Sequence, residues 1–433
     1  MSTSAGVQRV VLQPDAQGWA QLAHDAWAHR SEDALRFRSQ VGLPTDRPII
    51  MTGHQPGFWH PGILAKYIAA DRLARQVHGA AAAVIVDHDA KQPTVIDMPV
   101  QSAGGSWAAQ SVDLSSERAA PDTPTTYAKR SALAHEMLVA ATGTSVARVA
   151  QTNVQLLSPW FQCSDFDAGA ILATDFGRQL LDGARTDAHA MASAYNDALS
   201  RWNVGIPRLT IESGQRVELP LWWIDRSGER RRAWSDDQTE QTESRLAPRA
   251  LLLTALLRMV GCDLFVHGTG GGVYDQATSA WIGTWLGRDL APMVVASADV
   301  LLPLEHAGPG RAEAARATWQ AHRAPHDPSL LGEMERSATK HAMLREIEGT
   351  RDAGARRAIY ERMHVELAAY RTAHAAQLEA LSRQAADTQR AAKRADVAER
   401  RDWPAMLYAP EVLEELASRI EAALASSAAP ADV

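Results

Sequence analysis

The 433-residue sequence contains only two cysteines, Cys163 and Cys262, which excludes a disulfide framework and a cysteine-rich zinc site. It has no excess of positive charge, because 44 lysines and arginines stand against 51 aspartates and glutamates, so the field that attracts nucleic acid is missing. No stretch approaches the roughly 20 apolar residues of a membrane span, and Met1 to Gln13 has no signal-peptide core. These absences predict a cytoplasmic protein that binds neither nucleic acid nor membranes.

Lysine is also scarce, and Lys66 is one of only five in the chain. Hydrophobic residues make up 46% and charged residues 22%, which is typical of a globular protein with a real core. At roughly 150 residues per domain, the length predicts two or three structural units.

The first half of the chain contains a β-α-β pattern. Pro48 to Met51 predicts a buried strand, and the glycine- and proline-rich residues 52–62 predict a loop. Apolar residues spaced by three and four from Ile63 to Val77 predict a helix. Ala81 to Val86 then predicts a parallel strand that ends at Asp87-His88-Asp89.

The same order returns later. A helix over residues 245–260 and a strand over 263–266 lead into the glycine-rich stretch 267–272, predicted as a loop, before a helix over 274–286 and a strand over 293–296. This order predicts an α/β fold with a Rossmann-like parallel-sheet core of the class I synthetase or nucleotidyltransferase type. Ligands of such sheets bind at the carboxyl ends of the strands.

The region between these halves and the C-terminal region differ in pattern. Residues 168–202 predict one helix, 208–212 and 218–224 predict strands, and Arg230-Arg231-Arg232 predicts a solvated turn. Beyond residue 328, apolar residues spaced by threes and fours from Ile359 to Ala392 predict a coiled coil, either a helical hairpin or one long rod. The predicted organisation is 1–100 and 246–327 for the two halves of the core, 101–245 for an inserted subdomain, 328–402 for the coiled coil, 403–425 for a helix returning to the core, and 426–433 for a disordered tail.

The stretch from Thr52 to Lys66 is a candidate anion site. Its glycines allow backbone N–H groups to approach an anion, and the helix that follows adds the positive end of its dipole. A plain strand-to-helix connection would account for the same residues. His60-Pro61-Gly62-Ile63 is similar to the first half of the HIGH signature of class I synthetases, without its second histidine. The candidate binding residues are Thr52, Gly53, His54, Gln55, Gly57, His60 and Lys66.

Two further candidate clusters follow strands. Asp87, His88 and Asp89 offer general acid and base groups, although Asp89 could simply cap a turn, and no metal site is expected there. The second cluster is the glycine-rich stretch that begins at His267. It lacks the spacing of a dinucleotide fingerprint and of a Walker loop, but it can form a nest of N–H groups for a carboxylate or phosphate. Its candidate binding residues are His267, Gly268, Thr269, Gly270, Gly271, Gly272, Tyr274 and Asp275.

These motifs resemble the bacillithiol biosynthesis cysteine-adding enzyme family. In that family a strand leads into Thr-Gly-Gln-Gln-x-Gly, a Gly/Pro pair, a helix with a lysine, and a strand ending in Asp-His-Asp. His54 replaces the first Gln here, and Val86 replaces an acidic residue. The segment 246–249, which contributes Arg249, resembles the family's Arg-Pro segment before a glycine-rich stretch. The matching residues of the first motifs are Thr52, Gly53, Gln55, Gly57, Lys66, Asp87, His88 and Asp89.

The resemblance implies a ligase that adds cysteine, or another amino acid, to the amine of an anionic amino-sugar conjugate such as glucosaminyl malate. It implies a coiled coil used in homodimerisation. We expect His88 to act as the general base, with Asp87 or Asp89 orienting its ring. No cofactor is certain from the residues, and ATP or ADP is the candidate. Two alternatives stay open: an ATP-dependent nucleotidyltransferase-like enzyme acting on a small anionic substrate, and a non-catalytic coiled-coil assembly protein.

Overall fold

The computed structural model describes residues 5–88, 92–103, 105–213, 216–226, 228–237, 244–304 and 311–425. Asp89 and the predicted tail at 426–433 therefore lie outside the described residues. The chain forms two compact units: a sheet unit within residues 4–100, 109–302 and 401–433, and a helical unit within residues 101–108 and 303–400. The boundaries at 100, 245 and 327 stay predictions of the sequence. Among the described helices, none is both long and apolar enough to cross a bilayer.

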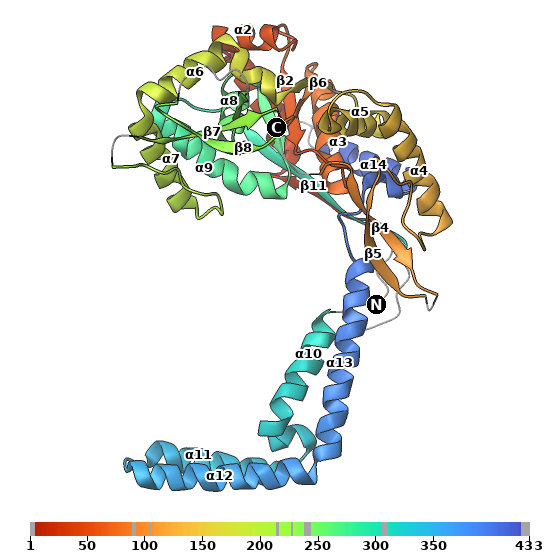
Figure 1. Ribbon diagram of the computed structural model, residues 1–433, viewed down its shortest axis with the longest axis vertical. Helices are drawn as coiled ribbons and strands as arrows, with labels where there is room; N and C mark the ends of the chain where they lie inside the picture. The colour runs from red at the N-terminus through yellow and green to blue at the C-terminus, as the bar shows by residue number, and fades with distance from the viewer. Residues whose placement is uncertain are drawn as a thin grey trace, which may run out of the picture. The chain divides into compact units, whose positions relative to one another are not determined.

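The sheet unit is built on a six-stranded, mainly parallel sheet (Figure 1), which confirms the predicted α/β fold class. Only β1 runs antiparallel, against β11, among the strand pairs of this sheet. The chain places β3 and β6 on one side of β2, then β10 and β11 on the other, so the strand order reverses between β2 and β10. The strands, in spatial order, are β1 (Gly6–Gln13), β11 (Met293–Leu301), β10 (Leu264–His267), β2 (Ile49–His54), β3 (Ala80–Ile85) and β6 (Ser164–Asp167).

Helices cover both faces of this sheet. Helix α3 (Pro61–Gln76) packs against β2, β3 and β11, and α14 (Pro410–Ala425) packs on α3. The opposite face carries a continuous apolar cluster that joins Met51 and Val84 to the side chains of α6 to α9. The other helices and strands of this unit are α1 (Trp19–Ala28), α2 (Glu32–Gln40), β4 (Val95–Gln101), β5 (Trp107–Asp113), α4 (Thr125–Ala140) and α5 (Ser145–Leu157).

The predicted β-α-β unit is confirmed as β2, α3 and β3, with β2 and β3 parallel. Strand β2 continues to His54, so Thr52 and Gly53 are strand residues, and the prediction of a loop from residue 52 is wrong by three residues. Gly53 is required there, because a Cβ would lie 2.3 Å from Val84 Cγ1 on the neighbouring strand.

The glycine-rich stretch 267–272 is not the predicted loop. His267 is the last residue of β10, and α9 (Thr269–Leu286) begins at once, with Gly268 as its N-cap. Close packing explains why glycines form this helical turn: a Cβ on Gly272 would lie 2.6 Å from Val295 Cγ2. Tertiary contact therefore overrides the low helix propensity of glycine.

Two predicted helices divide into shorter elements. The helix predicted over 168–202 is wrong: Thr174 interrupts it by capping α6, its hydroxyl accepting a hydrogen bond from Gly177 N. The helix predicted over 245–260 begins with a strand instead. The elements observed are the 3₁₀ turn η2 (Ala168–Ala173), α6 (Asp175–Thr186), α7 (Ala188–Trp202), β9 (Ser244–Pro248), α8 (Ala250–Leu256) and the π turn η3 (Leu257–Gly261).

The residues between α7 and α8 form a three-stranded antiparallel sheet in the order β8-β7-β9. The strand predicted at 218–224 is confirmed as β7 (Glu218–Asp225), whereas the one predicted at 208–212 is reduced to a single bridge between Ile211 and Val217. Arg230 to Arg232 begin strand β8 (Arg230–Trp234), so the prediction of a solvated turn is wrong. The arginines alternate along a strand, which sends neighbours to opposite faces.

A buried ion pair joins the amino-terminal ends of the central strands. Arg38 on α2 lies 2.9 Å from Asp263, and both side chains are at most 2% exposed. The other carboxylate oxygen of Asp263 accepts a hydrogen bond of 2.7 Å from the backbone N–H of Ile49, the first residue of β2. The charge of Asp263 is therefore matched within the fold.

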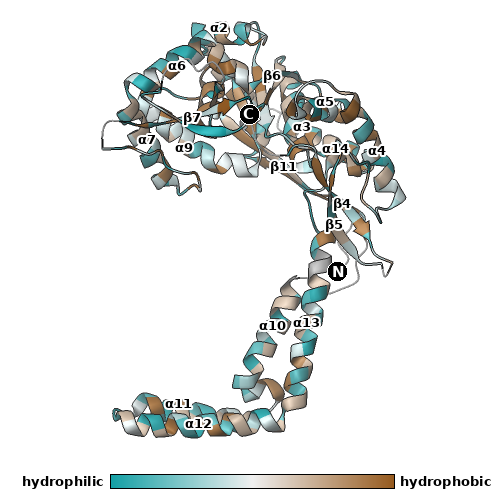
Figure 2. Ribbon diagram, in the orientation of Figure 1, coloured by the Kyte–Doolittle hydropathy of each residue, from teal (hydrophilic) through white to brown (hydrophobic). Residues whose placement is uncertain are grey.

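The helical unit consists of paired helices. Figure 2 shows that polar and apolar residues alternate along them. Helix α10 (Arg311–Arg323) pairs with α13 (Ala375–Ala398), and α11 (Met334–Gly349) forms a hairpin with α12 (Ala353–Ala373). The seam predicted to run from Ile359 to Ala392 is divided at His374, where α12 ends. A hairpin, and not one rod, is the form present.

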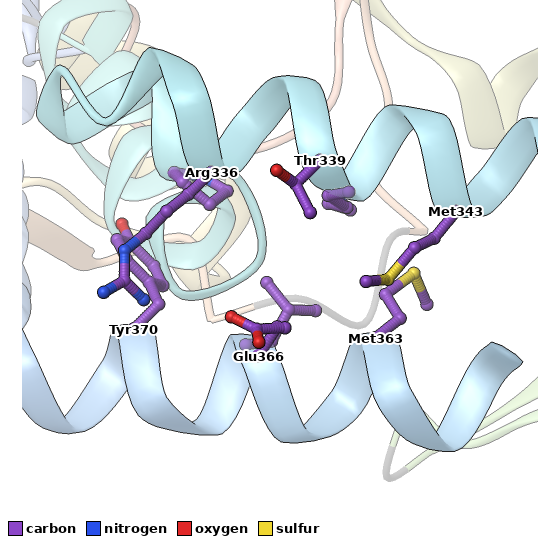
Figure 3. A pocket seen from close by; sticks show the side chains of 9 residues that line it. Arg336, Thr339, Met343, Met363, Glu366 and Tyr370 are labelled. Atoms are coloured by element: carbon purple, nitrogen blue, oxygen red, sulfur yellow. The ribbon is translucent and has the colours of Figure 1, made fainter. Parts of the chain in front are cut away.

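The α11–α12 hairpin closes over its own apolar residues. Figure 3 shows Met343 and Met363 pointing toward one another from the two helices. Tyr370 is 1% exposed, and its hydroxyl donates to Ala324 O at 2.9 Å. The space left between the helices is only about 40 Å³, about the size of a water molecule, so it offers no room for a metabolite.

Candidate functional site

A cavity of about 630 Å³ lies at the carboxyl ends of β2 and β10, where the strand order reverses. This is the position at which open α/β sheets bind their ligands, and the volume suits a small molecule. All of its lining residues belong to the sheet unit. The cavity brings together thirteen residues predicted from the sequence: Gly53, His54, Gln55, His60, Lys66, His88, Arg249, His267, Gly268, Thr269, Gly270, Gly271 and Tyr274.

Three residues predicted to bind ligand in the loops are structural instead. Thr52 is fully buried, and its hydroxyl donates to Val266 O at 2.8 Å, which joins β2 to β10. Gly57 does not line the cavity, and its carbonyl accepts from the Asn153 side chain at 2.9 Å. Gly272 packs on Val295. The direct ligand roles predicted for these residues are therefore not supported by the geometry.

Lys66 is the most unusual side chain of the cavity. It is 4% exposed, and its Nζ donates 2.6 Å to Gly53 O. No carboxylate of the described residues pairs with it. Burial lowers the pKa of Lys66 from 10.5 to about 7. An anion in the cavity would favour the charged form of this amine.

His60 forms the entry to α3 beside Lys66. Its Nδ1 accepts a hydrogen bond of 3.1 Å from Gly62 N, which caps the helix and leaves Nε2 as the protonated nitrogen of the neutral ring. Burial, opposed by Asp402 and assisted by the Lys66 charge, lowers the pKa of His60 to about 4. His60 is therefore neutral at pH 7 and can offer a ring N–H to a ligand.

Two helices begin at the cavity wall. Gly62 at the start of α3 and Gly270 and Gly271 at the start of α9 all line it. The first N–H groups of a helix have no partner within the helix, and the helix dipole makes this end attractive to anions. Gly271 also makes room for a side chain of the site, because a Cβ there would lie 2.5 Å from His267 Nδ1.

The two residues of the Asp-His motif at the end of β3 have different positions relative to the cavity. The buried His88 lines the cavity, whereas Asp87 does not. Asp87 lies 3.5 Å from His88 Nδ1 and is itself fixed by Gly169 N at 2.8 Å and Arg245 at 3.1 Å. Burial alone would raise the pKa of Asp87, but His88, Arg245 and Gly169 lower it below its usual value. Asp87 is therefore an ionised carboxylate beside His88, whose Nδ1 is buried and forms no hydrogen bond with the described residues.

A second histidine–carboxylate pair stands across the cavity on β10 and α9. His267 Nε2 lies 2.9 Å from Asp275 Oδ2, and Arg258 lies 2.8 Å from the same oxygen. Asp275 is completely buried and does not line the cavity, so the structure does not support the direct ligand contact predicted for it. Its role is to hold His267, whose ring does line the cavity.

Several lining residues that surround the predicted Arg249 escaped the sequence analysis. Arg249 lies 2.7 Å from the buried Glu218, its guanidinium stands 3.9 Å from the centre of the Trp222 ring, and Arg232 reaches Glu218 at 3.2 Å. The tryptophan pair and the arginine run were visible in the sequence, but only the β7–β8 pairing brings Trp222, Arg230 and Arg232 to the cavity. The residues missed include Tyr195, Glu218, Trp222, Arg230, Arg232, Thr254 and Ser297.

The cysteines do not contribute thiolate chemistry. Both are free and neither lines the cavity. Burial raises the pKa of Cys163 to about 12, assisted by Asp165 and Asp71, and raises that of Cys262 further. Across the described part of the chain, histidines, cysteines and acidic residues do not gather in groups of three that could hold a metal ion.

No known family model matches this chain, and no curated protein matches it. Among solved structures, it is similar to the tyrosyl-tRNA synthetase of Archaeoglobus fulgidus, determined in complex with L-tyrosine. The match has 11% sequence identity and a TM-score of 0.28, and it covers 65% of this chain and 65% of that one. The chain thus spans somewhat less than two thirds of that protein.

Proposed function

We propose that this protein is a ligase of the bacillithiol-biosynthesis type, which joins cysteine or another amino acid to the amine of an anionic amino-sugar conjugate such as glucosaminyl malate. The main support for this proposal is Lys66, a buried amine that lines the cavity without an ion-pair partner among the described residues. A buried charge is costly unless it is paired. An anionic ligand supplies the missing partner, which accounts for the retention of a lysine at this place.

His88 is the proposed general base. It lines the cavity, and the ionised Asp87 beside it favours the ring orientation that a base requires. In amide formation, the attacking amine loses a proton as its nitrogen bonds to the carbonyl carbon and the group that activates the carboxyl departs, and His88 is the residue proposed to receive that proton. Asp89, the other orienting group expected from the sequence, lies outside the described residues.

ATP is the cofactor we propose for this ligase. The residues fit its phosphates, since the first turn of α9, the Lys66 amine and the His60 ring N–H all offer donors to one cavity. When bound, ATP would supply the free energy for activation of the amino-acid carboxyl group. We further propose that the helical unit mediates homodimerisation, which light scattering coupled to size exclusion would test.

The test is mass-spectrometric detection of an amide product from cysteine and glucosaminyl malate, with and without ATP. We expect product from the wild type and a loss of 100-fold or more, on the order of the usual contribution of a general base, in His88→Ala. The control is His24→Ala, which alters an exposed histidine on α1. Absence of product from the folded wild type would contradict the proposed reaction.

A second candidate function is nucleotidyl transfer to a small anionic substrate. It is favoured by His60, which caps α3 next to Pro61-Gly62 at the point where the strand order reverses. Release of pyrophosphate from ATP without formation of an amide would support this reaction. A non-catalytic assembly protein would instead tolerate His88→Ala and Lys66→Met with no change in any ligand-binding measurement.

A further inference from the structure

The wall of the cavity formed by α7, β7 and α8 carries a second group of donors, separate from Lys66. Tyr195 on α7 is 1% exposed and lines the cavity. Its ring packs edge-on against Trp281 at 5.0 Å between centroids, which fixes its direction. Among the described residues, no side chain or backbone group forms a hydrogen bond with its hydroxyl.

Arg249 is held on three sides. Its Nε donates to Leu221 O at 3.1 Å, its Nη2 lies 2.7 Å from Glu218 Oε1, and its plane stands over the Trp222 ring at 3.9 Å. The remaining Nη1 has no partner among the described residues. A guanidinium fixed in this way presents its free N–H groups at little further cost in side-chain entropy.

Glu218 is already saturated. One oxygen pairs with Arg249, and the other accepts from Thr210 N at 3.1 Å and from Arg232 at 3.2 Å. Two arginines therefore surround one carboxylate, so Arg249, Arg232 and Glu218 together carry one net positive charge. Because the unpartnered groups are donors, this wall suits the oxygens of an anion and not an ammonium group.

We propose that Tyr195 and Arg249 form a carboxylate-binding subsite in this cavity, distinct from the anion site at Lys66. The inference rests on the proposed function in that the carboxylate belongs either to the acceptor, as in a malyl group, or to the incoming amino acid. Burial alone lowers the pKa of Lys66. Burial is also the main cause that lowers the pKa of Arg249, but Glu218, Tyr195 and Arg232 affect this pKa as well. This difference is expected for two separate charge environments.

The test is calorimetric titration of the full-length protein with L-malate, L-cysteine and inorganic phosphate. We expect Tyr195→Phe to weaken binding of a carboxylate probe about tenfold and Arg249→Gln to weaken it more, as for hydrogen bonds to charged groups. Phosphate affinity should change less than about twofold, because its partner is Lys66. Tyr195→Phe removes a single oxygen, so it keeps the test valid if Arg249→Gln fails to fold.

Matched controls exist in the same unit. Tyr127→Phe removes the hydroxyl of another buried tyrosine, and Arg216→Gln removes an arginine that stacks on Trp234 at 4.4 Å and pairs with Asp236 at 2.8 Å. Neither residue lines the cavity.

The outcomes distinguish which ligand occupies the proposed subsite and whether the subsite exists. Weaker malate binding assigns the subsite to the acceptor, and weaker cysteine binding assigns it to the amino acid. Unchanged affinities in Tyr195→Phe, or no carboxylate binding by the wild type, would overturn the subsite. The amide assay is independent: a wild type that binds malate through Tyr195 but makes no amide would refute the proposed reaction and leave the subsite standing.

Discussion

Strands β2 and β10 have a buried charged group at each end, and the two groups differ in whether a charged partner lies beside them. At the amino-terminal end, Arg38 and Asp263 neutralise one another, and Asp263 also holds the first N–H of β2. At the carboxyl-terminal end, Lys66 is nearly as buried, but its amine donates to the Gly53 carbonyl oxygen and pairs with no carboxylate of the described residues. The comparison teaches that burial alone does not single out a candidate residue, whereas a buried amine without a carboxylate partner among the described residues does.

The largest expected effect is at the paired end. Arg38→Met leaves Asp263 buried without its cation, which should lower the free energy of unfolding by about 3 to 5 kcal/mol. Urea denaturation measures this loss. The double variant Arg38→Met/Asp263→Asn should recover part of it, and Arg357→Met in the exposed Arg357–Glu361 pair of the helical unit should cost less than about 1 kcal/mol. A small loss in Arg38→Met would remove the distinction between the two ends.

Lys66→Met should act in the opposite direction and stabilise the protein at neutral pH, by roughly 2 to 3 kcal/mol, because the wild type buries an unpaired amine. The folded pKa of about 7 lies below the usual 10.5, so between these values the unfolded chain binds more protons. The wild type therefore gains stability as pH rises through this window, by at most about 1.4 kcal/mol per pH unit, and the advantage of Lys66→Met shrinks. Denaturation at pH 7 and pH 9 compares them, with exposed Lys129→Met as the control.

Anion affinity should depend on the same proton. As pH rises above about 7, free Lys66 loses its charge, and the affinity for inorganic pyrophosphate should fall by up to about tenfold per pH unit. Titration calorimetry at pH 6.5, 7.5 and 8.5, conditions chosen to bracket this pKa, measures the change. The slope should vanish in Lys66→Met. An equal slope in both proteins would show that another group receives the anion.

The smallest expected effect concerns the helix entry. His60→Ala removes the cap of α3 and should cost about 0.5 to 2 kcal/mol, whereas His60→Asn should restore most of it. The wild-type ring resists protonation down to pH about 4, below its ordinary 6.5, so its contribution is present above pH 6.5 and declines toward pH 4. Thermal melts at pH 5 and pH 7 should show a smaller pH difference in His60→Asn.

The sequence predicted the cavity best where it is local. The β2-α3-β3 unit, His60 and Lys66 follow one another in the chain, and the spacing of apolar residues places them together. The other wall could not be predicted, because Tyr195, Glu218 and Arg249 meet only when α7 packs on α9 and β7 pairs with β8 and β9. Those contacts join segments without a shared local pattern.

Glycine was misleading for a related reason. Gly270 to Gly272 have the composition of a loop but form the first turn of α9, where His267 leaves no space for a side chain at Gly271 and Val295 leaves none at Gly272. The break at Thr174 and the division of the long seam at His374 likewise depend on caps and packing that periodicity does not encode.

The chain leaves the sheet unit after β11 and returns to it at Arg401. Asp299 near the end of β11 forms an ion pair with Arg401, the residue at which the chain returns, so the two ends of the excursion over residues 303–400 are fixed beside one another. A segment whose ends meet can be lengthened, shortened or exchanged without stretching the body from which it emerges. The length of these helices can therefore change without disturbing the cavity beside β2 and β10.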